Sequence, residues 1–180
     1  MFVGLVAAKG DSKRFKNKNI HPVDGYPMFW HSVKPLLDSN LVGDVFVLTD
    51  SDFVKQYCKE NGVNTIHRSH NASRSEDKLI SILRYGYYNL DQEYDGVVTI
   101  MANCPGHTAK QVDSCLSMMR DKGLFEVRSF NISGEESGLM AFSKNIIESN
   151  QDVSYYVGCS IDEVIEVHYK EDIKKVKKSW

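Results

Sequence analysis

The first twenty residues constrain the fold of this chain more than any other stretch. Residues 2–8 are a short apolar run, Phe-Val-Gly-Leu-Val-Ala-Ala, which predicts a buried β-strand. Gly10 then permits close approach of a ligand to the backbone, and Ser12 offers a hydroxyl. The strand and loop predict a site for a phosphate-rich ligand, although a solvated basic loop fits these residues equally well. Five cations follow the strand within ten residues: Lys9, Lys13, Arg14, Lys16 and Lys18.

This opening resembles that of the sugar-activating cytidylyltransferases, in particular the acylneuraminate (CMP-sialic acid synthetase-like) family. Two positions depart from the family pattern, because Lys9 stands in place of an arginine and Asp11 in place of a second glycine. The resemblance implies a Rossmann-like α/β fold, a three-layer α/β/α sandwich around a mostly parallel sheet. The matching residues are Ala8 to Arg14, Lys16 to Ile20, Pro22, Gly25 and Pro27.

Patterning along the rest of the chain favours the same fold class independently. Apolar runs alternate with capped, helix-like segments, as in a doubly wound parallel sheet with right-handed crossovers. The polar loops after residues 8, 48, 67 and 101 each follow a predicted strand, where such sheets bind ligands. Further strands are predicted over residues 44–49, 63–67, 95–101, 125–132, 138–142 and 161–167, and helices begin near residues 27, 53, 75, 108 and 171.

Composition is that of one ordinary globular domain, so we expect a single domain over residues 1–180. The net charge of −2 and the pI of about 6.3 argue against a nucleic-acid partner. Residues 2–8 are too short for a membrane span and lack the preceding basic residues of a signal peptide, so no membrane partner is expected. The widely spaced cysteines, Cys58, Cys104, Cys115 and Cys159, predict free thiols in a cytoplasmic protein.

The resemblance also implies which residues bind nucleotide. Lys13 and Lys9 would be the catalytic cations that hold the triphosphate of CTP. Arg68 matches the start of a segment that forms the cytosine and ribose pocket, and Asp50 is interpreted as a helix cap and loop support. The expected nucleotide-binding residues are Ala8, Gly10, Ser12, Asn17, Lys18, Arg68 and Ser73.

An acceptor site and a Mg²⁺ site are implied further along the chain. Asn103 and His107 lie in the loop that should face the acceptor, and Glu166, His168 and Asn103 are the candidate metal ligands. A carboxylate suits Mg²⁺, whereas histidine suits softer metals. Asn103 as a turn residue, and Glu166 and His168 as solvent-facing strand residues, remain alternatives.

The function implied by the resemblance is transfer of CMP from CTP to a sugar acid of the acylneuraminate (nonulosonic) type, or a similar anionic acceptor, with release of pyrophosphate. Such enzymes serve surface polysaccharide biosynthesis. The subgroup carries a dimerisation insertion between about residues 119 and 138 that this chain lacks, so we expect a monomer or a dimer through a different interface. A nucleotide-binding protein without activity is the main alternative, and a glycosyltransferase of similar fold is less favoured.

Overall fold

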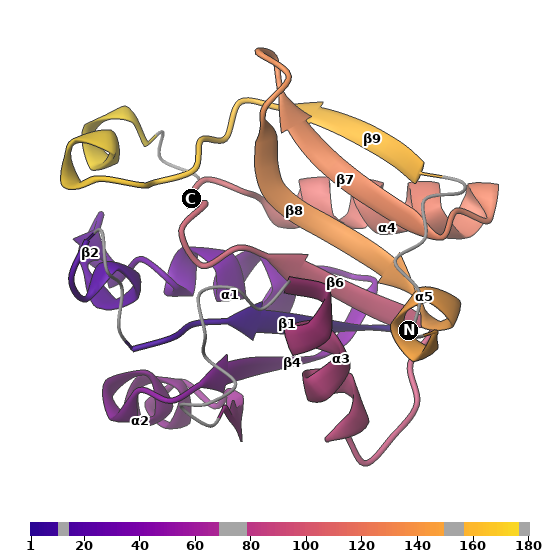
Figure 1. The fold of residues 1–180 in the computed structure, drawn as a ribbon, viewed down its shortest axis with the longest axis horizontal. Coiled ribbons are helices and arrows are strands. Elements are labelled where there is room, and N and C mark those ends of the chain that lie inside the picture. Colours follow the sequence, from indigo (N-terminus) through magenta and orange to yellow (C-terminus); the bar gives the residue numbers. More distant parts are fainter. Residues whose placement is uncertain (11–14, 69–78, 150–156, 177–180) are drawn as a thin grey trace.

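The computed structural model describes residues 1–10, 15–68, 79–149 and 157–176, which build one seven-stranded sheet (Figure 1). The strand order is β5-β4-β1-β6-β8-β7-β9, so the N-terminal strand lies near the middle, as its apolar sequence predicts. The strands are β1 (Phe2–Ala7), β4 (Val42–Thr49), β5 (Asn64–His67), β6 (Gly96–Ile100), β7 (Glu126–Asn131), β8 (Glu136–Ser143) and β9 (Val157–Asp162).

Most neighbouring strands run parallel, which confirms the predicted sheet type. β1 pairs in parallel with β4 and β6, β4 with β5, and β7 with β9. β8 is the exception, because it runs antiparallel to both β6 and β7. Only a short turn joins β7 to β8, with Gly134 at φ +81°. Such a turn makes two neighbouring strands antiparallel, because parallel neighbours need a longer crossover connection.

Helices cover both faces of the sheet and give the predicted three layers. α1 (Trp30–Leu37), α2 (Asp52–Glu60) and α4 (Ala109–Lys122) pack on one face, against alternate strand residues such as Val6 and Val47. α3 (Leu79–Tyr88) and α5 (Lys144–Glu148) pack on the other face, against Val3, Leu5 and Phe142. In the described part of the chain, no helix has the length and apolarity needed to cross a membrane.

The C-terminal region differs from the sequence prediction. The last strand covers residues 157–162 rather than 161–167, and the predicted C-terminal helix is a 3₁₀ helix, η3 (Lys170–Lys175). The strand ends early because Oδ1 of Asp162 accepts a hydrogen bond from the amide of Val164, which turns the chain away from the sheet. Val164 and Val167 are nevertheless buried, so their apolar pattern reports burial and not a strand.

A small hairpin precedes α1 where the sequence analysis predicted the start of a helix. β2 (Pro22–Val23) pairs with β3 (Tyr26–Pro27), and α1 begins only at Trp30. The turn residues Asp24 and Gly25 both have positive φ, 47° and 87°. An Asp-Gly pair between two short runs is a strong hairpin signal, so the sequence contained the information that predicts this turn.

Gly138 in β8 offers a test of how tightly the sheet packs on the loop after β6. Its φ is +90°, and a Cβ atom there would lie 2.9 Å from Cβ of Cys104, whereas a Cβ at Gly134 would meet nothing within 4 Å. We expect Gly138→Ala to lower the free energy of unfolding by roughly 2 kcal/mol or more, from strain and overpacking together. Gly134→Ala should cost only about 1 kcal/mol, from strain alone. Urea unfolding would measure both, and equal losses would contradict the packing argument.

Candidate functional site

The loops that follow β1, β4 and β6 leave the sheet at its carboxyl edge, side by side. This placement follows from the strand order, because β1 lies between β4 and β6 and all three are parallel. Ligands of open parallel sheets bind at this edge, where the backbone ends of several strands converge. The candidate site is therefore built around the glycine loop that begins at Ala8.

The start of this loop is held by the neighbouring strand and its loop. The amide of Ala8 donates to the carbonyl of Leu48 at 3.0 Å, and the amide of Gly10 donates to Oδ1 of Asp50 at 2.7 Å. A Cβ at Gly10 would lie 3.2 Å from Cβ of Ser51, so a larger residue would crowd this approach. Asp50 thus supports the loop, as the sequence analysis favoured, while the cap of α2 is Ser51, whose side chain accepts from Val54.

The end of the loop is held by a second set of contacts. Asn17 has φ 59° and ψ 28°, a left-handed conformation that asparagine tolerates better than most residues. It leads into η1 (Lys18–Ile20), where Nδ2 of the buried Asn19 donates to the carbonyl of Lys9 at 2.9 Å. Asn19 was not among the expected site residues, although it lies within the motif. Side chains of the motif and of the loop after β4 therefore hold both ends of this loop.

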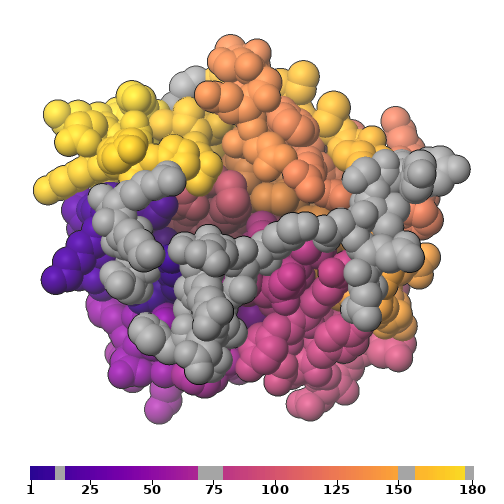
Figure 2. All heavy atoms as spheres, viewed as in Figure 1, coloured from indigo at the N-terminus to yellow at the C-terminus, as the bar shows by residue number. Residues whose placement is uncertain are grey.

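The C-terminal segment joins this loop to the loop after β6. Nζ of Lys18 donates to the carbonyl of Val167 at 3.1 Å. Nδ2 of Asn103 donates to Oε1 of Glu166 at 2.7 Å and to the Val167 carbonyl at 3.1 Å, while the Val167 amide donates to the Asn103 carbonyl. Figure 2 shows the same approach on the surface, with the yellow C-terminal residues lying against the indigo N-terminal ones. Four predicted site residues thus converge: Lys18, Asn103, Glu166 and His168.

The convergence does not fit a magnesium site. Oε1 of Glu166 accepts from the Asn103 amide, and Oε2 lies 3.3 Å from Nε2 of His168, so nitrogen groups engage both carboxylate oxygens. Mg²⁺ requires several hard oxygen ligands in near-octahedral geometry. Across the described residues, no three histidine, cysteine or acidic side chains gather closely enough to hold a metal ion. The expected ligand set therefore forms a hydrogen-bonded cluster in which a single carboxylate is already engaged.

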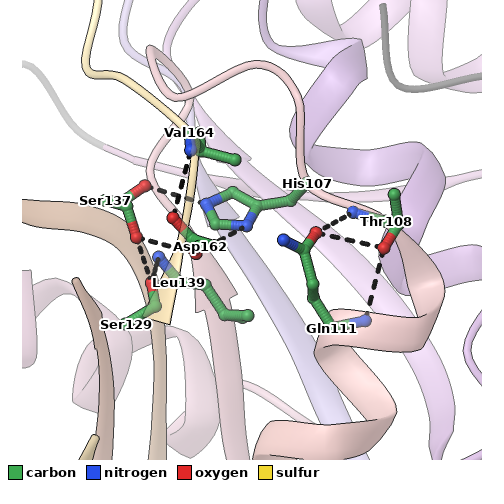
Figure 3. A network of polar contacts seen from close by, with 8 residues as sticks. All are labelled: His107, Thr108, Gln111, Ser129, Ser137, Leu139, Asp162 and Val164. Atoms are coloured by element: carbon green, nitrogen blue, oxygen red, sulfur yellow. Dashed lines mark hydrogen bonds and ion pairs between the residues drawn. The ribbon is translucent and has the colours of Figure 1, made fainter. Parts of the chain in front are cut away.

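His107 lies in the interior rather than at the acceptor surface (Figure 3). None of its side chain is exposed, its Nε2 lies 2.8 Å from the carbonyl of Ser137, and its Nδ1 lies 3.6 Å from Oδ2 of Asp162. Ser137 connects the carboxylate of Asp162 at 2.9 Å with the hydroxyl of Ser129 at 2.6 Å. A direct contact with an acceptor would require this network to open.

The network ties the loop after β6 to three strands and to one helix. Ser129, Ser137 and Asp162 come from β7, β8 and β9, and the loop that carries His107 leads into α4. α4 begins with a capping box between Thr108 and Gln111, as Thr108 predicts. The loop is therefore fixed at both ends, and its position depends on buried polar groups that the sequence analysis did not connect.

The remaining expected residues fall into two groups. Arg68 is only 4 % exposed, and its amide donates to the carbonyl of Thr49 at 3.1 Å, which holds the loop after β5 against β4. Lys13, Ser12 and Ser73 lie outside the described residues, so their roles remain predictions.

The chain is similar in sequence to a known protein family and to several known proteins. The family model for cytidylyltransferases matches residues 3–136. A 2-C-methyl-D-erythritol 4-phosphate cytidylyltransferase from Chlorobaculum parvum is 34% identical over 73 residues, covering 36% of this chain and 30% of that protein. An N-acylneuraminate cytidylyltransferase from Streptococcus agalactiae serotype III is 23% identical over 139 residues, covering 75% of this chain and 33% of that protein. The chain thus spans about a third of the length of these curated relatives.

Solved structures share the fold over nearly the whole chain. A CMP:2-keto-3-deoxy-manno-octonic acid synthetase complexed with CTP superposes with a TM-score of 0.79, at 14% identity, covering 96% of this chain and 95% of that one. A Mycobacterium tuberculosis H37Rv protein in complex with manganese superposes with a TM-score of 0.69, at 10% identity, covering 98% of each. At these identities the similarity shows the fold alone.

The buried network predicts a pH dependence of stability. Burial lowers the pKa of His107 below its ordinary value of 6.5, against smaller raising effects of the Ser137 carbonyl and Asp162. Below pH 6.5 the unfolded chain therefore binds a proton that the folded chain does not, and the free energy of unfolding falls as the pH falls. We expect His107→Gln to weaken this fall, measured by urea unfolding between pH 7 and pH 5.

Two further histidines define the controls for this experiment. Burial also lowers the pKa of His31, so part of the pH dependence should survive in His107→Gln. His67 is exposed, and His67→Gln should leave the dependence as it is in the parent protein. An unchanged dependence in His107→Gln would show that the buried ring does not govern it.

Proposed function

Because the chain belongs to the cytidylyltransferase family, we propose that it transfers CMP from CTP to a sugar-like acceptor and releases pyrophosphate. The observation that carries the proposal is the anchored glycine loop, with the Gly10 amide on Asp50 at 2.7 Å and the Lys9 carbonyl on Asn19 at 2.9 Å. These contacts fix the backbone of Lys9 and Gly10, directly after β1, before the ligand arrives. Such preorganisation is the main protein contribution to transfer reactions at phosphorus.

The reaction requires an in-line displacement at the α-phosphorus of CTP. An acceptor oxygen forms the new bond to the α-phosphorus, the bond to the bridging oxygen of the β-phosphate breaks, and the acceptor hydroxyl loses its proton. The lysines of the loop, Lys9 and Lys13, would offset the negative charge on the triphosphate and on the departing pyrophosphate. Lysine serves as a point charge here, without the two-pronged grip of arginine.

The acceptor is proposed to be anionic. The relatives and the solved synthetase name three different acceptors, an acylneuraminate, a keto-deoxy-octonic acid and an erythritol phosphate, and each carries an acidic group. A sugar acid of the acylneuraminate type is the preferred candidate, because the N-terminal motif of this chain resembles that subgroup. The loop after β6 differs from the subgroup, and its Asn103 is the residue we propose nearest to the acceptor.

A nucleotide-binding role without catalysis is the second candidate. The observation that favours it is the engagement of both oxygens of Glu166 by Asn103 and His168. A carboxylate whose two oxygens are both engaged does not offer them to a metal ion beside the triphosphate.

Calorimetric titration with CTP, ATP, GTP and UTP tests the proposal and the role of Asp50. We expect selective CTP binding, and a loss of affinity of roughly tenfold or more in Asp50→Ala, because the Gly10 amide loses a charge-assisted hydrogen bond. Asp50→Asn keeps an acceptor oxygen and should lose less. Asp52→Ala removes an exposed carboxylate two residues away, which pairs with Lys55, and should bind like the parent protein.

Turnover separates the two candidate functions. Pyrophosphate release from CTP in the presence of sugar acids supports the enzyme, and Lys13→Ala should abolish it while leaving the fold intact. CTP binding without turnover across the acceptor panel supports the non-catalytic candidate. Absence of binding to any of the four nucleotides would contradict both.

The metal-site departures generate a further prediction. The double variant Asn103→Asp with His168→Asp places three carboxylates in the cluster around Glu166, so magnesium should strengthen CTP binding more than it does in the parent protein. The matched control, Asn64→Asp with His67→Asp, adds two carboxylates on the exposed strand β5 and should show no such gain. Titrations of CTP with and without magnesium measure the effect, and equal magnesium responses in the two variants would rule out the assigned positions.

A further inference from the structure

The carboxylate of Asp162 contacts two separate segments of the chain (Figure 3). Its Oδ2 accepts a hydrogen bond from the Ser137 hydroxyl at 2.9 Å, and its Oδ1 accepts one from the Val164 amide at 3.1 Å. Only 3 % of this side chain is exposed, so protein groups rather than bulk water satisfy its oxygens. One buried carboxylate thus joins the start of β8 to the segment that follows β9.

Ser137 extends this junction to the loop after β6. Nε2 of His107 lies 2.8 Å from the Ser137 carbonyl, and a carbonyl only accepts, so Nε2 carries the hydrogen of this contact. Among the described residues, Nδ1 of the same ring has no hydrogen-bond partner and lies 3.6 Å from Oδ2 of Asp162. The carboxylate is therefore tied to the His107 loop through both polar groups of Ser137, its hydroxyl and its carbonyl.

The loop after β6 and the segment after β9 meet again at the candidate site. The Val167 amide donates to the Asn103 carbonyl at 2.7 Å, and Nδ2 of Asn103 donates to the Val167 carbonyl at 3.1 Å. Nδ2 also donates to Oε1 of Glu166 at 2.7 Å. His107 lies four residues after Asn103, and Asp162 lies five residues before Val167. The two segments are thus joined at two points a few residues apart.

The two junctions differ in burial. His107 and Ser137 have no exposed surface, whereas the side chains of Glu166 and His168 are 31 % and 44 % exposed. A ligand at the carboxyl edge of the sheet can therefore reach the second junction but not the first. The buried junction can act on a reaction only by holding the exposed one in place.

We propose that Asp162 is a positioning residue for the transfer of CMP, an inference that rests on the proposed function. It keeps the segment after β9 against the loop after β6, and so holds Asn103, the residue proposed nearest to the acceptor. The glycine loop has its own anchors, Asp50 and Asn19, so loss of Asp162 should affect the acceptor more than CTP. A misplacement of about 1 Å can cost on the order of a hundredfold in rate.

A role in stability alone is the alternative, and Asp113 supplies the matched control. Its carboxylate accepts from the Ser39 hydroxyl and from the Asn40 amide at 3.1 Å, so it holds a hydroxyl and an amide as Asp162 does. It lies beside the start of β4, at the amino end of that strand and away from the candidate site. Loss of Asp113 therefore measures what such a carboxylate contributes to the fold without touching the site.

Amide hydrogen exchange tests the positioning without requiring turnover. Relative to amides of β1 in the same sample, the Val167 amide should exchange roughly tenfold faster or more in Asp162→Ala, because both hydrogen bonds of the carboxylate are lost. Asp162→Asn keeps an oxygen for the Val164 amide and should fall between the two. Asp113→Ala should leave Val167 as in the parent protein. Ser137→Ala removes one hydroxyl and gives the same direction of change should Asp162→Ala fail to fold by circular dichroism.

Steady-state kinetics with CTP and sugar acids tests the role in transfer. In Asp162→Ala, kcat/KM for the acceptor should fall roughly tenfold or more, with a smaller change in CTP affinity and partial recovery in Asp162→Asn. Asp113→Ala should keep the kinetics of the parent protein. Unchanged exchange at Val167, or equal losses for acceptor and CTP, would overturn the proposal. A parent protein without turnover would overturn the proposed enzyme, and the role of Asp162 in transfer with it, whatever the exchange result.

Discussion

The hydrogen bond between the Gly10 amide and the Asp50 carboxylate is the contact on which the candidate site depends. It joins the loop after β1 to the loop after β4, and the parallel pairing of those strands brings its two partners to the same edge. Two further contacts hold the start of the glycine loop, from the Ala8 amide to Leu48 and from Asn19 to the Lys9 carbonyl, but neither reaches the loop after β4. The contact is also local in space but distant in sequence, 40 residues apart, so it forms only when β1 and β4 are in register. The geometry of the site therefore depends on the register between β1 and β4.

Local sequence signals predicted most of the strands and helices, but not where the chain reverses or leaves the sheet. The apolar run at residues 2–8, the cap at Thr108 and the alternation of strands and helices each act over a few residues, and each matches an observed element. The reversal at β8 and the early end of β9 depend instead on a short turn and on the Asp162 side chain. The Asp24–Gly25 hairpin is a different case, because its signal is local.

The sequence predicted which residues lie in the site better than it predicted what those residues contact. Lys18, Asn103, Glu166 and His168 do converge, although they span 150 residues of sequence. Asn103 and His168 contact Glu166, and Lys18 and Asn103 contact the Val167 carbonyl, which a list of matching positions cannot show. His107 illustrates the same limit, since its residue type suggests a polar ligand contact while the fold places it in a buried network with Asp162. Burial of a polar side chain is decided by residues distant in sequence, here Ser137 and Asp162.

Asp162 connects the end of the sheet with the candidate site. It is the last residue of β9 and, through Ser137 and the amide of Val164, it fixes the point where the chain leaves the sheet edge. The segment that follows carries Glu166 and Val167 to Asn103 and Lys18. The end of β9 and the candidate site are therefore linked through a few residues of continuous chain, Asp162 to Val167.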